Sequence, residues 1–297
     1  MEKLVSVVIP TYKRDKALEL ALNSLLTQTY TNFEIVVVDD NADKDWNEKV
    51  ENVVNEFTKN NPTIKLNYIQ NEVNLGSAKT RNLGIDASNG EYVTFLDDDD
   101  EYLPEKIESQ VAFMIENSLD YSVTDLDLYY DNGKLSEHKT RYYIQKTDAE
   151  SLFKYHLMYH ITGTDTMMFS KDYLIKIGKF APIDVGDEFY LMQRAIENGG
   201  TFGYLPVSHV KAIIHTSDDG LSSGDGKILG ENQLYQYKKK YFDRLTRKEK
   251  RYVKMRHNAV LAFAEKRRGK LFRFVKYALA SMFIAPIACI KLLLNRN

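Results

Sequence analysis

Residues 90–100 read GEYVTFLDDDD, an apolar run of strand length that ends in four consecutive aspartates, Asp97 to Asp100. A run this apolar is normally buried in a sheet, and four carboxylates at its end repel one another. A hard divalent cation, Mg²⁺ or Mn²⁺, would neutralise that repulsion, because such ions prefer carboxylate oxygens. The alternative is a solvated acidic turn before a helix predicted to begin near Pro104. The stretch alone therefore favours a metal site over a plain turn.

Two earlier apolar runs have the same form, a buried strand followed closely by polar residues. They are residues 4–9, with Thr11 and Tyr12 after them, and residues 33–38, with Asp39 and Asp40 after them. Segments with helical spacing of apolar residues separate the runs, which predicts an α/β fold with a doubly wound, mostly parallel sheet. In such sheets ligands bind where the carboxyl ends of the strands meet. We therefore expect the three polar strand ends to converge on one edge.

The composition limits the class of protein and its compartment. The chain has 297 residues, 43% of them hydrophobic and 28% charged, enough for one large α/β domain with an appendage. A net charge of −2 gives no overall field that attracts nucleic acid, so no nucleic-acid partner is expected. The single cysteine, Cys289, excludes an intrachain disulfide framework and is typical of a reducing compartment. No signal peptide is evident, so we expect a cytoplasmic protein.

The C-terminal tail is expected to be helical and basic, and two interpretations of it remain open. Residues 277–294 are mostly apolar but interrupted by Ser281, Pro286 and Lys291, and they fall short of the about 20 residues that span a bilayer. Six Lys or Arg residues lie just upstream, within residues 266–276. A basic flank beside an apolar face suits a helix lying on the cytoplasmic face of an anionic membrane. The same pattern suits packing on the catalytic domain or contact within a homo-oligomer.

An ordered series of motifs makes the chain resemble the family 2 glycosyltransferases, which have the GT-A fold. The motifs are VSVVIPTYKR (5–14), FEIVVVDDNA (33–42), NLGSAKTRNLG (74–84), GEYVTFLDDDD (90–100), IGKF (177–180), GDEFYLMQR (186–194) and an isolated His215 before a Ser-rich loop. The resemblance is strong over residues 4–104 and does not extend into the tail. It implies a GT-A domain with a nucleotide-sugar-binding half over 1–104 and an acceptor-binding half over 105–230. A basic helical extension over 231–297 would follow.

The resemblance implies sugar transfer from a nucleotide-diphosphate donor, most often a UDP-sugar. In the family the end of the first strand contacts the base, and here that segment supplies Pro10, Thr11, Tyr12 and Arg14. An aspartate after the second strand accepts a hydrogen bond from uracil N3–H, which assigns that role to Asp40 or to its neighbour Asp39. The alternative for one or both of them is helix capping.

The third motif, residues 74–84, supplies the remaining donor contacts that the resemblance implies. Asn74 and Gly76 are expected to shape a turn, and Arg81 is placed to meet uracil or phosphate. The alternative for Arg81 is an ion pair on the surface of a helix.

The Asp-x-Asp metal motif of the family maps onto Asp97, Asp98 and Asp99. Asp99 is the expected metal ligand, and Asp97 is expected to contact ribose or metal. Asp98 takes the variable middle position of the motif and is expected to lie in the nucleotide-sugar-binding site. The run of four leaves this register ambiguous by one residue, so the role of Asp100 is open. A histidine placed like His215 helps to hold metal or pyrophosphate in related enzymes, and a structural histidine is the alternative. The bound Mn²⁺ or Mg²⁺ would neutralise the departing diphosphate.

The resemblance also implies a general base. Family members place an acidic pair, usually Glu-Asp, at the start of a helix beneath the acceptor, and here the order is reversed to Asp187-Glu188. In register, Glu188 takes the place of the usual catalytic aspartate and would remove the proton of the acceptor hydroxyl. Asp187 is a second candidate, because another rotamer could reach the same point. The carboxylate that is not the base would complement the helix macrodipole.

The expected activity is therefore inverting, non-processive sugar transfer, in bacterial cell-surface polysaccharide or glycoprotein synthesis. Processive family members usually carry Gln-x-x-Arg-Trp and several membrane spans, whereas the single tryptophan here, Trp46, lies far from such a place. The acceptor would be a hydroxyl of a glycan, lipid-linked or protein-linked molecule. A catalytically silent nucleotide-sugar-binding scaffold of the same fold is the alternative. A nucleotidyltransferase is disfavoured, because residues 10–17 lack the glycines of a triphosphate loop.

Overall fold

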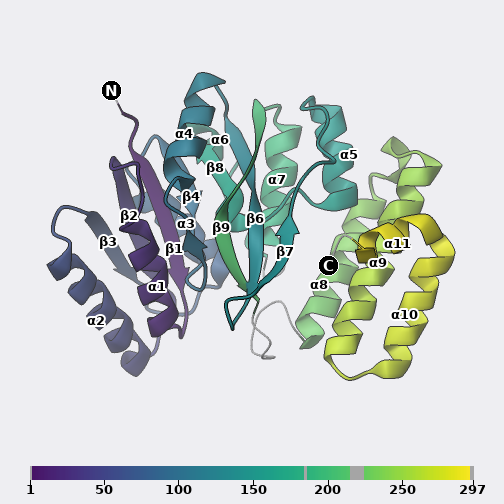
Figure 1. Cartoon of the computed structure of the whole chain (residues 1–297), viewed down its shortest axis with the longest axis horizontal. Helices are drawn as coiled ribbons and strands as arrows, with labels where there is room; N and C mark the ends of the chain where they lie inside the picture. Colours follow the sequence, from purple (N-terminus) through teal and green to yellow (C-terminus); the bar gives the residue numbers. More distant parts are fainter. Residues whose placement is uncertain (1, 184–185, 215–223, 295–297) are drawn as a thin grey trace. The chain divides into compact units, whose positions relative to one another are not determined.

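The chain forms two compact units in a computed structural model that describes residues 2–183, 186–214 and 224–294 (Figure 1). The first unit carries the sheet and comprises Met1–Ala149 and Ile161–Ile214. The second unit is helical and comprises Glu150–His160 and His215–Asn297.

The first unit is built on a mixed nine-stranded sheet with the order β3-β2-β1-β4-β8-β6-β9-β5, and β7 pairs with β6. The strands are β1 (Val5–Thr11), β2 (Phe33–Asp39), β3 (Lys65–Gln70), β4 (Tyr92–Phe95), β5 (Glu101–Tyr102), β6 (Tyr121–Tyr130), β7 (Leu135–Lys139), β8 (Met167–Ser170) and β9 (Phe202–Ile214). The four strands from β3 to β4 are parallel, and β8 runs antiparallel to both of its neighbours. The predicted α/β class is confirmed.

The register of the parallel strands brings their polar ends level. Thr11 is paired with Asp39, and Asp39 with Gln70, so β1, β2 and β3 end at the same height. The Asp40 N–H donates to the Thr11 carbonyl at 2.9 Å, one residue beyond the strands. β4 pairs with β1 up to Phe95 and leads directly into the acidic run. The expected convergence on one edge of the sheet is therefore present.

Helices cover both faces of this sheet. Those of the first unit are α1 (Asp15–Leu25), α2 (Lys44–Asn60), α3 (Ser77–Ala87), α4 (Lys106–Glu116), α6 (Lys171–Lys176) and α7 (Asp187–Glu197). Side chains alternate along a strand, so Val7 packs into the core formed with α1, α2 and α4, while Val8 faces α3. A Cβ on Gly84 of α3 would lie 2.3 Å from Val8 Cγ1. Glycine therefore lets α3 lie close to β1 and brings its first turns to the strand ends.

The second unit contains the predicted C-terminal helical extension. Its helices are α5 (Ala149–Tyr159), α8 (Gly224–Lys239), α9 (Arg247–Arg267), α10 (Leu271–Ile284) and α11 (Pro286–Leu294). α10 runs back along α9, and the hydrogen bonds between them include Ser281 Oγ to the Met255 carbonyl at 3.0 Å and Arg251 Nε to the Ile284 carbonyl at 2.9 Å. Over the described ranges, no helix has both the length and the hydropathy needed to cross a bilayer.

Candidate active site

The end of β1 is tied to the acidic turn after β4 through Asp98. Thr11 Oγ1 donates to Asp98 Oδ2 at 2.8 Å, and the Tyr12 N–H donates to the same oxygen at 3.2 Å. Arg14 Nη1 lies 3.0 Å from Asp98 Oδ1 and 2.6 Å from Asp99 Oδ2, so one guanidinium balances two carboxylates. Burial raises the pKa of Asp98 to about 6, although Arg14 opposes the shift. These contacts fix the geometry of the turn.

Asp39, the last residue of β2, is fully buried and holds the loop that follows it. It accepts hydrogen bonds from the Asn41 N–H at 2.9 Å and from the Tyr68 hydroxyl at 2.8 Å. The next helix, α2, is capped by Asp43. Neither Asp39 nor Asp40 therefore caps α2, whereas Asp40 accepts from the N–H of Gly76, the N-cap residue of α3.

Asp40 holds the turn of the third motif against β2. Its Oδ1 accepts from the Leu75 N–H at 2.7 Å and from Asn71 Nδ2 at 2.8 Å, and its Oδ2 accepts from the Gly76 N–H at 2.9 Å. Asn74 Nδ2 donates to the Asp40 carbonyl at 2.9 Å. Gly76 has a φ of +79°, which a side chain would strain. The turn formed in this way sets where α3 begins.

Arg81 of α3 joins the acidic turn to the start of α7. Its Nη2 lies 2.7 Å from Asp97 Oδ1 and its Nη1 3.1 Å from Asp187 Oδ2. The side chain is only 8% exposed, so the alternative of a surface ion pair is wrong. Within the described part of the chain, Arg81 Nε is buried and has no hydrogen-bond partner. The guanidinium thus links two carboxylates and keeps a spare donor.

The loop that carries the IGKF motif is fixed to α3 beside Arg81. Asn82 Nδ2 donates to the Phe180 carbonyl at 2.9 Å, and the Phe180 N–H donates back to Asn82 Oδ1 at 2.9 Å. Gly178 and Lys179 both have positive φ values, which turns the chain sharply at this point. The Phe180 ring lies 5.5 Å from the Arg81 guanidinium, so the motif supports the arginine.

Three carboxylates, from Asp97, Asp100 and Asp165, converge so that one oxygen of each lies within 4.8 Å of the others. Asp165 belongs to the 3-10 turn before β8 and was not predicted from the sequence. The Asp97 N–H donates to Asp165 Oδ1 at 2.6 Å, and the Ile213 N–H donates to Asp100 Oδ1 at 2.9 Å. Burial raises the pKa of Asp165 to about 8 and that of Asp100 well above its usual value.

This trio has the chemistry of a hard-cation site. Its ligand atoms are all carboxylate oxygens, which Mg²⁺ and Mn²⁺ prefer, and buried carboxylates that repel one another are stabilised by such an ion. Asp97 was expected near the metal. Asp99 was also expected there, but it pairs with Arg14 and is not one of the three. The ambiguity of register in the acidic run therefore matters, because Asp100 takes part in the trio.

The start of α7 carries both candidate bases in different surroundings. Asp187 is buried, and its Oδ1 accepts from the Glu188 N–H at 2.9 Å while its Oδ2 pairs with Arg81. Burial raises the pKa of Asp187, although Arg81 opposes the shift. Glu188 is partly exposed, and its Oε2 accepts from the Gly163 N–H at 2.9 Å. Asp187 is thus held in place by its partners, and Glu188 is the more accessible carboxylate.

Pro10 and His215 complete the set of predicted site residues. Pro10 lies within β1, paired with Val38 and one residue before Thr11. His215 lies outside the described residues, so its role at a metal stays a prediction. The other predicted residues lie at the carboxyl edge of the sheet or at the starts of α3 and α7.

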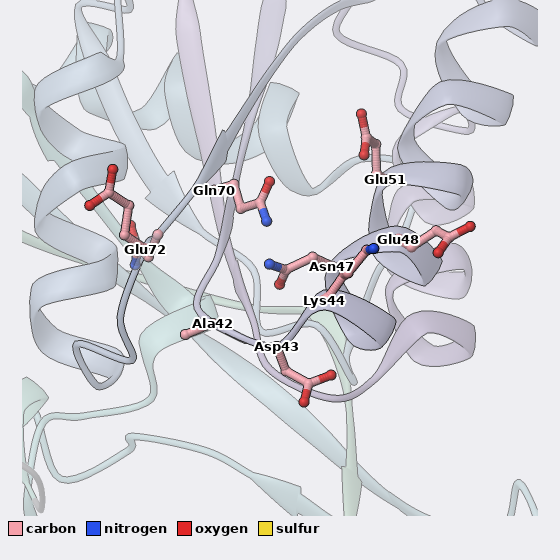
Figure 2. Close-up of a pocket in the computed structure, with 9 residues that line it drawn as sticks. Ala42, Asp43, Lys44, Asn47, Glu48, Glu51, Gln70 and Glu72 are labelled. Carbon is pink, nitrogen blue, oxygen red and sulfur yellow. The ribbon is translucent and has the colours of Figure 1, made fainter.

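A hollow of about 670 Å³ lies beside this edge, between α2 and the end of β3, as Figure 2 shows. Its lining has a net negative charge, because it contains Asp43, Glu48, Glu51 and Glu72 but a single lysine, Lys44. Such a lining repels a diphosphate. The carboxylate trio does not line the hollow. We therefore assign the candidate active site to the strand ends around Arg81.

Comparisons with other sequences find a matching family and several relatives. The pattern of glycosyl transferase family 2 matches residues 6–178. An uncharacterized glycosyltransferase of Methanocaldococcus jannaschii is 30% identical over 238 residues, which cover 79% of this chain and 77% of that protein. A UDP-Glc:alpha-D-GlcNAc-diphosphoundecaprenol beta-1,3-glucosyltransferase of Escherichia coli is 31% identical over 130 residues, 44% of this chain and 48% of that protein. A Rickettsia bellii glycosyltransferase, 38% identical, is matched over only 18% of its length.

Solved structures show the same fold. Residues 1–349 of Staphylococcus aureus TarS, solved in complex with UDP-GlcNAc, have a TM-score of 0.58 and 19% identity, covering 94% of this chain and 91% of that fragment. A mannosyltransferase from Pyrobaculum calidifontis in complex with GDP-Man and Mn²⁺ has a TM-score of 0.63 and 16% identity, covering 99% of this chain and 79% of that one. The predicted GT-A architecture is confirmed.

Proposed function

Because the chain belongs to glycosyl transferase family 2, we propose that it moves one sugar from a nucleotide-diphosphate donor to an acceptor hydroxyl with inversion. The observation that carries the proposal is the arrangement around Arg81. Its guanidinium bridges Asp97, a member of the carboxylate trio, and Asp187, the neighbour of Glu188 and the second candidate base. Groups suited to bind a diphosphate and groups suited to remove a proton therefore lie at one edge of the sheet.

The proposed donor is a UDP-hexose or a UDP-N-acetylhexosamine. The nucleoside would lie at the ends of β1 and β2, against Tyr12 and the loop that Asp40 holds. Arg14 and Arg81 are the cations available near the diphosphate. The Escherichia coli relative is named for UDP-Glc, and TarS was solved with UDP-GlcNAc, which supports uridine. The mannosyltransferase was solved with GDP-Man, so guanosine donors belong in the test.

A divalent cation, Mn²⁺ or Mg²⁺, is proposed as the cofactor. Asp97, Asp100 and Asp165 would hold it, with Asp99 and His215 as the further ligands that the family resemblance implies. Such an ion supplies positive charge for the diphosphate that leaves. The protein's own part is to fix the acidic turn, which Thr11 and Arg14 do through Asp98.

Glu188 is the proposed general base. It is the more accessible of the two carboxylates, and both hydrogen bonds that it accepts from described residues end on Oε2. It would take the proton of the acceptor hydroxyl as that oxygen attacks the anomeric carbon. Asp187 would position the start of α7 through its ion pair with Arg81.

The proposed acceptor is a glycan on a lipid or protein carrier in bacterial cell-surface polysaccharide synthesis. The name of the Escherichia coli relative specifies an acceptor linked to diphosphoundecaprenol, which supports a lipid carrier. Transfer of a single sugar is proposed because the chain lacks the Gln-x-x-Arg-Trp motif of processive family members.

Donor hydrolysis across UDP-, GDP- and dTDP-sugars, with Mn²⁺ and with EDTA, tests the proposal. The variants are Asp97→Asn, Asp99→Ala, Asp165→Asn and Glu188→Gln, with Asp172→Asn as an exposed control. Release of one nucleotide that EDTA and Asp97→Asn abolish would support the transferase. In the same assay with a carrier-linked glycan added as acceptor, Glu188→Gln should lower sugar transfer by at least about a hundredfold and leave donor affinity unchanged.

A silent nucleotide-sugar-binding scaffold gives a different result. It would bind a nucleotide sugar with the metal but release no nucleotide with any acceptor, and Glu188→Gln would change nothing. Absence of both binding and release across the panel would contradict both functions.

A further inference from the structure

The C-terminal helices expose apolar side chains at a density that the rest of the described chain does not reach. Of 18 large apolar side chains that are exposed, eight fall within residues 271–290. They are Leu271, Phe272, Val275, Leu279, Met282, Phe283, Ile287 and Ile290, with exposed fractions from 36% to 84%. We call these eight the apolar face of α10 and α11. Contiguous apolar surface of this kind marks an interaction site.

On α10 the apolar face is one stripe along the helix and not a scatter of residues. At about 100° per residue, its six members on α10 fall within an arc of about 120°. An arc of this width normally packs into a protein core. Here the opposite side of α10 packs on α9, where Ser281 donates to the Met255 carbonyl. The helix is therefore fixed to the protein by one side and presents the apolar side outward.

The charge around the stripe has one sign. Residues 266–297 contain eight Lys or Arg and no Asp or Glu. Lys266, Arg267, Lys270, Arg273 and Lys276 are exposed beside the start of the stripe. The neighbouring Glu265 is buried and forms ion pairs with Arg268 and Arg273, which offset part of their positive charge. The border of the stripe is therefore strongly cationic, although the whole chain carries a net charge of −2.

These features favour one of the binding partners that the sequence left open for the C-terminal tail. A second copy docked through the same face would bring two cationic borders together, which like-charge repulsion disfavours. A membrane-spanning role does not fit, because α10 has 14 residues and no described helix is long and apolar enough. A helix with exposed Phe, Leu and Met on one side and Lys and Arg beside them suits the interface of an anionic bilayer.

We propose that the apolar face of α10 and α11 binds an anionic lipid surface, with both helices lying in the plane of the interface. Phe272 and Phe283, the two most exposed members, enter the acyl boundary. Lys270, Arg273 and Lys276 contact the anionic headgroups. This inference does not depend on the proposed function, because the surface and its test involve no sugar donor.

Flotation of the full chain with vesicles tests the proposal. One set is pure phosphatidylcholine and the other contains about a third phosphatidylglycerol. We expect binding to the anionic set only, weakened at least tenfold between 50 mM and 500 mM salt. Phe272→Gln with Phe283→Gln should weaken binding at least tenfold, and so should Lys270→Gln with Arg273→Gln and Lys276→Gln.

Matched controls separate the face from general effects of polarity and charge. Leu20→Gln with Ile175→Gln removes two exposed apolar side chains elsewhere, and Lys59→Gln with Lys146→Gln removes two exposed charges. Both control proteins should bind like the parent chain, and all variants should retain its circular dichroism and melting temperature. Equal binding to neutral vesicles, or unchanged binding by the phenylalanine variant, would overturn the proposal. So would a parent chain that ignores vesicles and dimerises through this face.

Discussion

Arg81 is the residue on which the two sides of the candidate site depend. Its guanidinium is buried and balances Asp97 and Asp187 at once. Removal of one member of a buried ion-pair network leaves the others charged and unpaired, which costs far more than loss of a surface pair. The residue therefore affects folding as well as ligand binding.

Arg81→Met should lower the free energy of unfolding by about 3 kcal/mol. The reason is that Asp187, which is buried, and Asp97, which is partly exposed, would lose their shared cation. The control is Lys179→Met, whose partner Asp86 is exposed, and it should cost less than about 1 kcal/mol. Urea denaturation of both variants and of the parent measures the difference. Equal losses in the two variants would contradict the buried role of Arg81.

Lys106 of α4 should make the free energy of unfolding increase as the pH rises above 7. It is fully buried, with Gln110 as a hydrogen-bond partner, and burial lowers its pKa to about 7. The unfolded chain keeps this proton up to about pH 10.5, so it binds more protons than the folded chain between pH 7 and 10.5. The free energy of unfolding should therefore rise over that window, by at most about 1.4 kcal/mol per pH unit.

Lys106→Met provides the test, through urea denaturation at pH 7, 8 and 9. The parent should gain stability across this series, and the variant should gain less because it has no group that loses a proton there. An identical slope in the two proteins would show that Lys106 is not the source.

Asp165 should make metal binding depend on pH. Its pKa is raised to about 8 by burial and by Asp97, and that of Asp100 is also raised. A cation must displace these protons, so the affinity for Mn²⁺ should increase from pH 6 to pH 8. Asp165→Asn should weaken binding and flatten the dependence, whereas Asp172→Asn should do neither. Isothermal titration calorimetry with Mn²⁺ alone measures both, and an unchanged profile in Asp165→Asn would remove this residue from the site.

At the scale of elements, α3 shows how a single glycine positions the site. A Cβ at Gly84 would lie 2.3 Å from Val8 Cγ1, so Gly84→Ala should push α3 away from β1. Overpacking of this kind costs about 1–3 kcal/mol, more than the about 0.5–1 kcal/mol that alanine gains in a helix. Gly226→Ala in α8, where nothing lies within 4 Å, should stabilise instead. Thermal melts of the two variants should shift in opposite directions.

The sequence predicts those elements whose residue pattern is local. The apolar run at 33–38 became β2, and the helix expected to begin at the pair Asp187-Glu188 begins there as α7. Asp165 could not be found in this way, because it reaches the acidic turn only through the antiparallel pairing of β4 with β8. β5 has just two residues and follows the acidic run directly, which is too short for any periodic signal. Long-range pairing and very short strands are thus where local patterns fail.

At the scale of the whole molecule, the two units should respond differently to ligand. All described residues of the candidate site belong to the unit that carries the sheet. A ligand at a hundred times its Kd stabilises the state that binds it by about 2.7 kcal/mol. Hydrogen exchange with UDP and Mn²⁺ should therefore slow by up to about a hundredfold in the core strands β1, β2 and β4. Amides of α9 and α10 should keep their rates, and slowing there would contradict a site confined to the sheet.

The Arg81 bridge has a consequence for the order in which substrates arrive. While one guanidinium serves both Asp97 and Asp187, the two carboxylates share a single positive charge. A diphosphate that binds the Arg81 guanidinium offsets part of its positive charge. The electrostatic stabilisation of the Asp187 carboxylate and of the neighbouring Glu188 carboxylate is then weaker. Under the proposed function, the proton affinity of the Asp187 and Glu188 carboxylates then increases only after the nucleotide sugar is bound. Initial-rate kinetics should show compulsory order, with the donor entering first and free UDP competing with the donor alone.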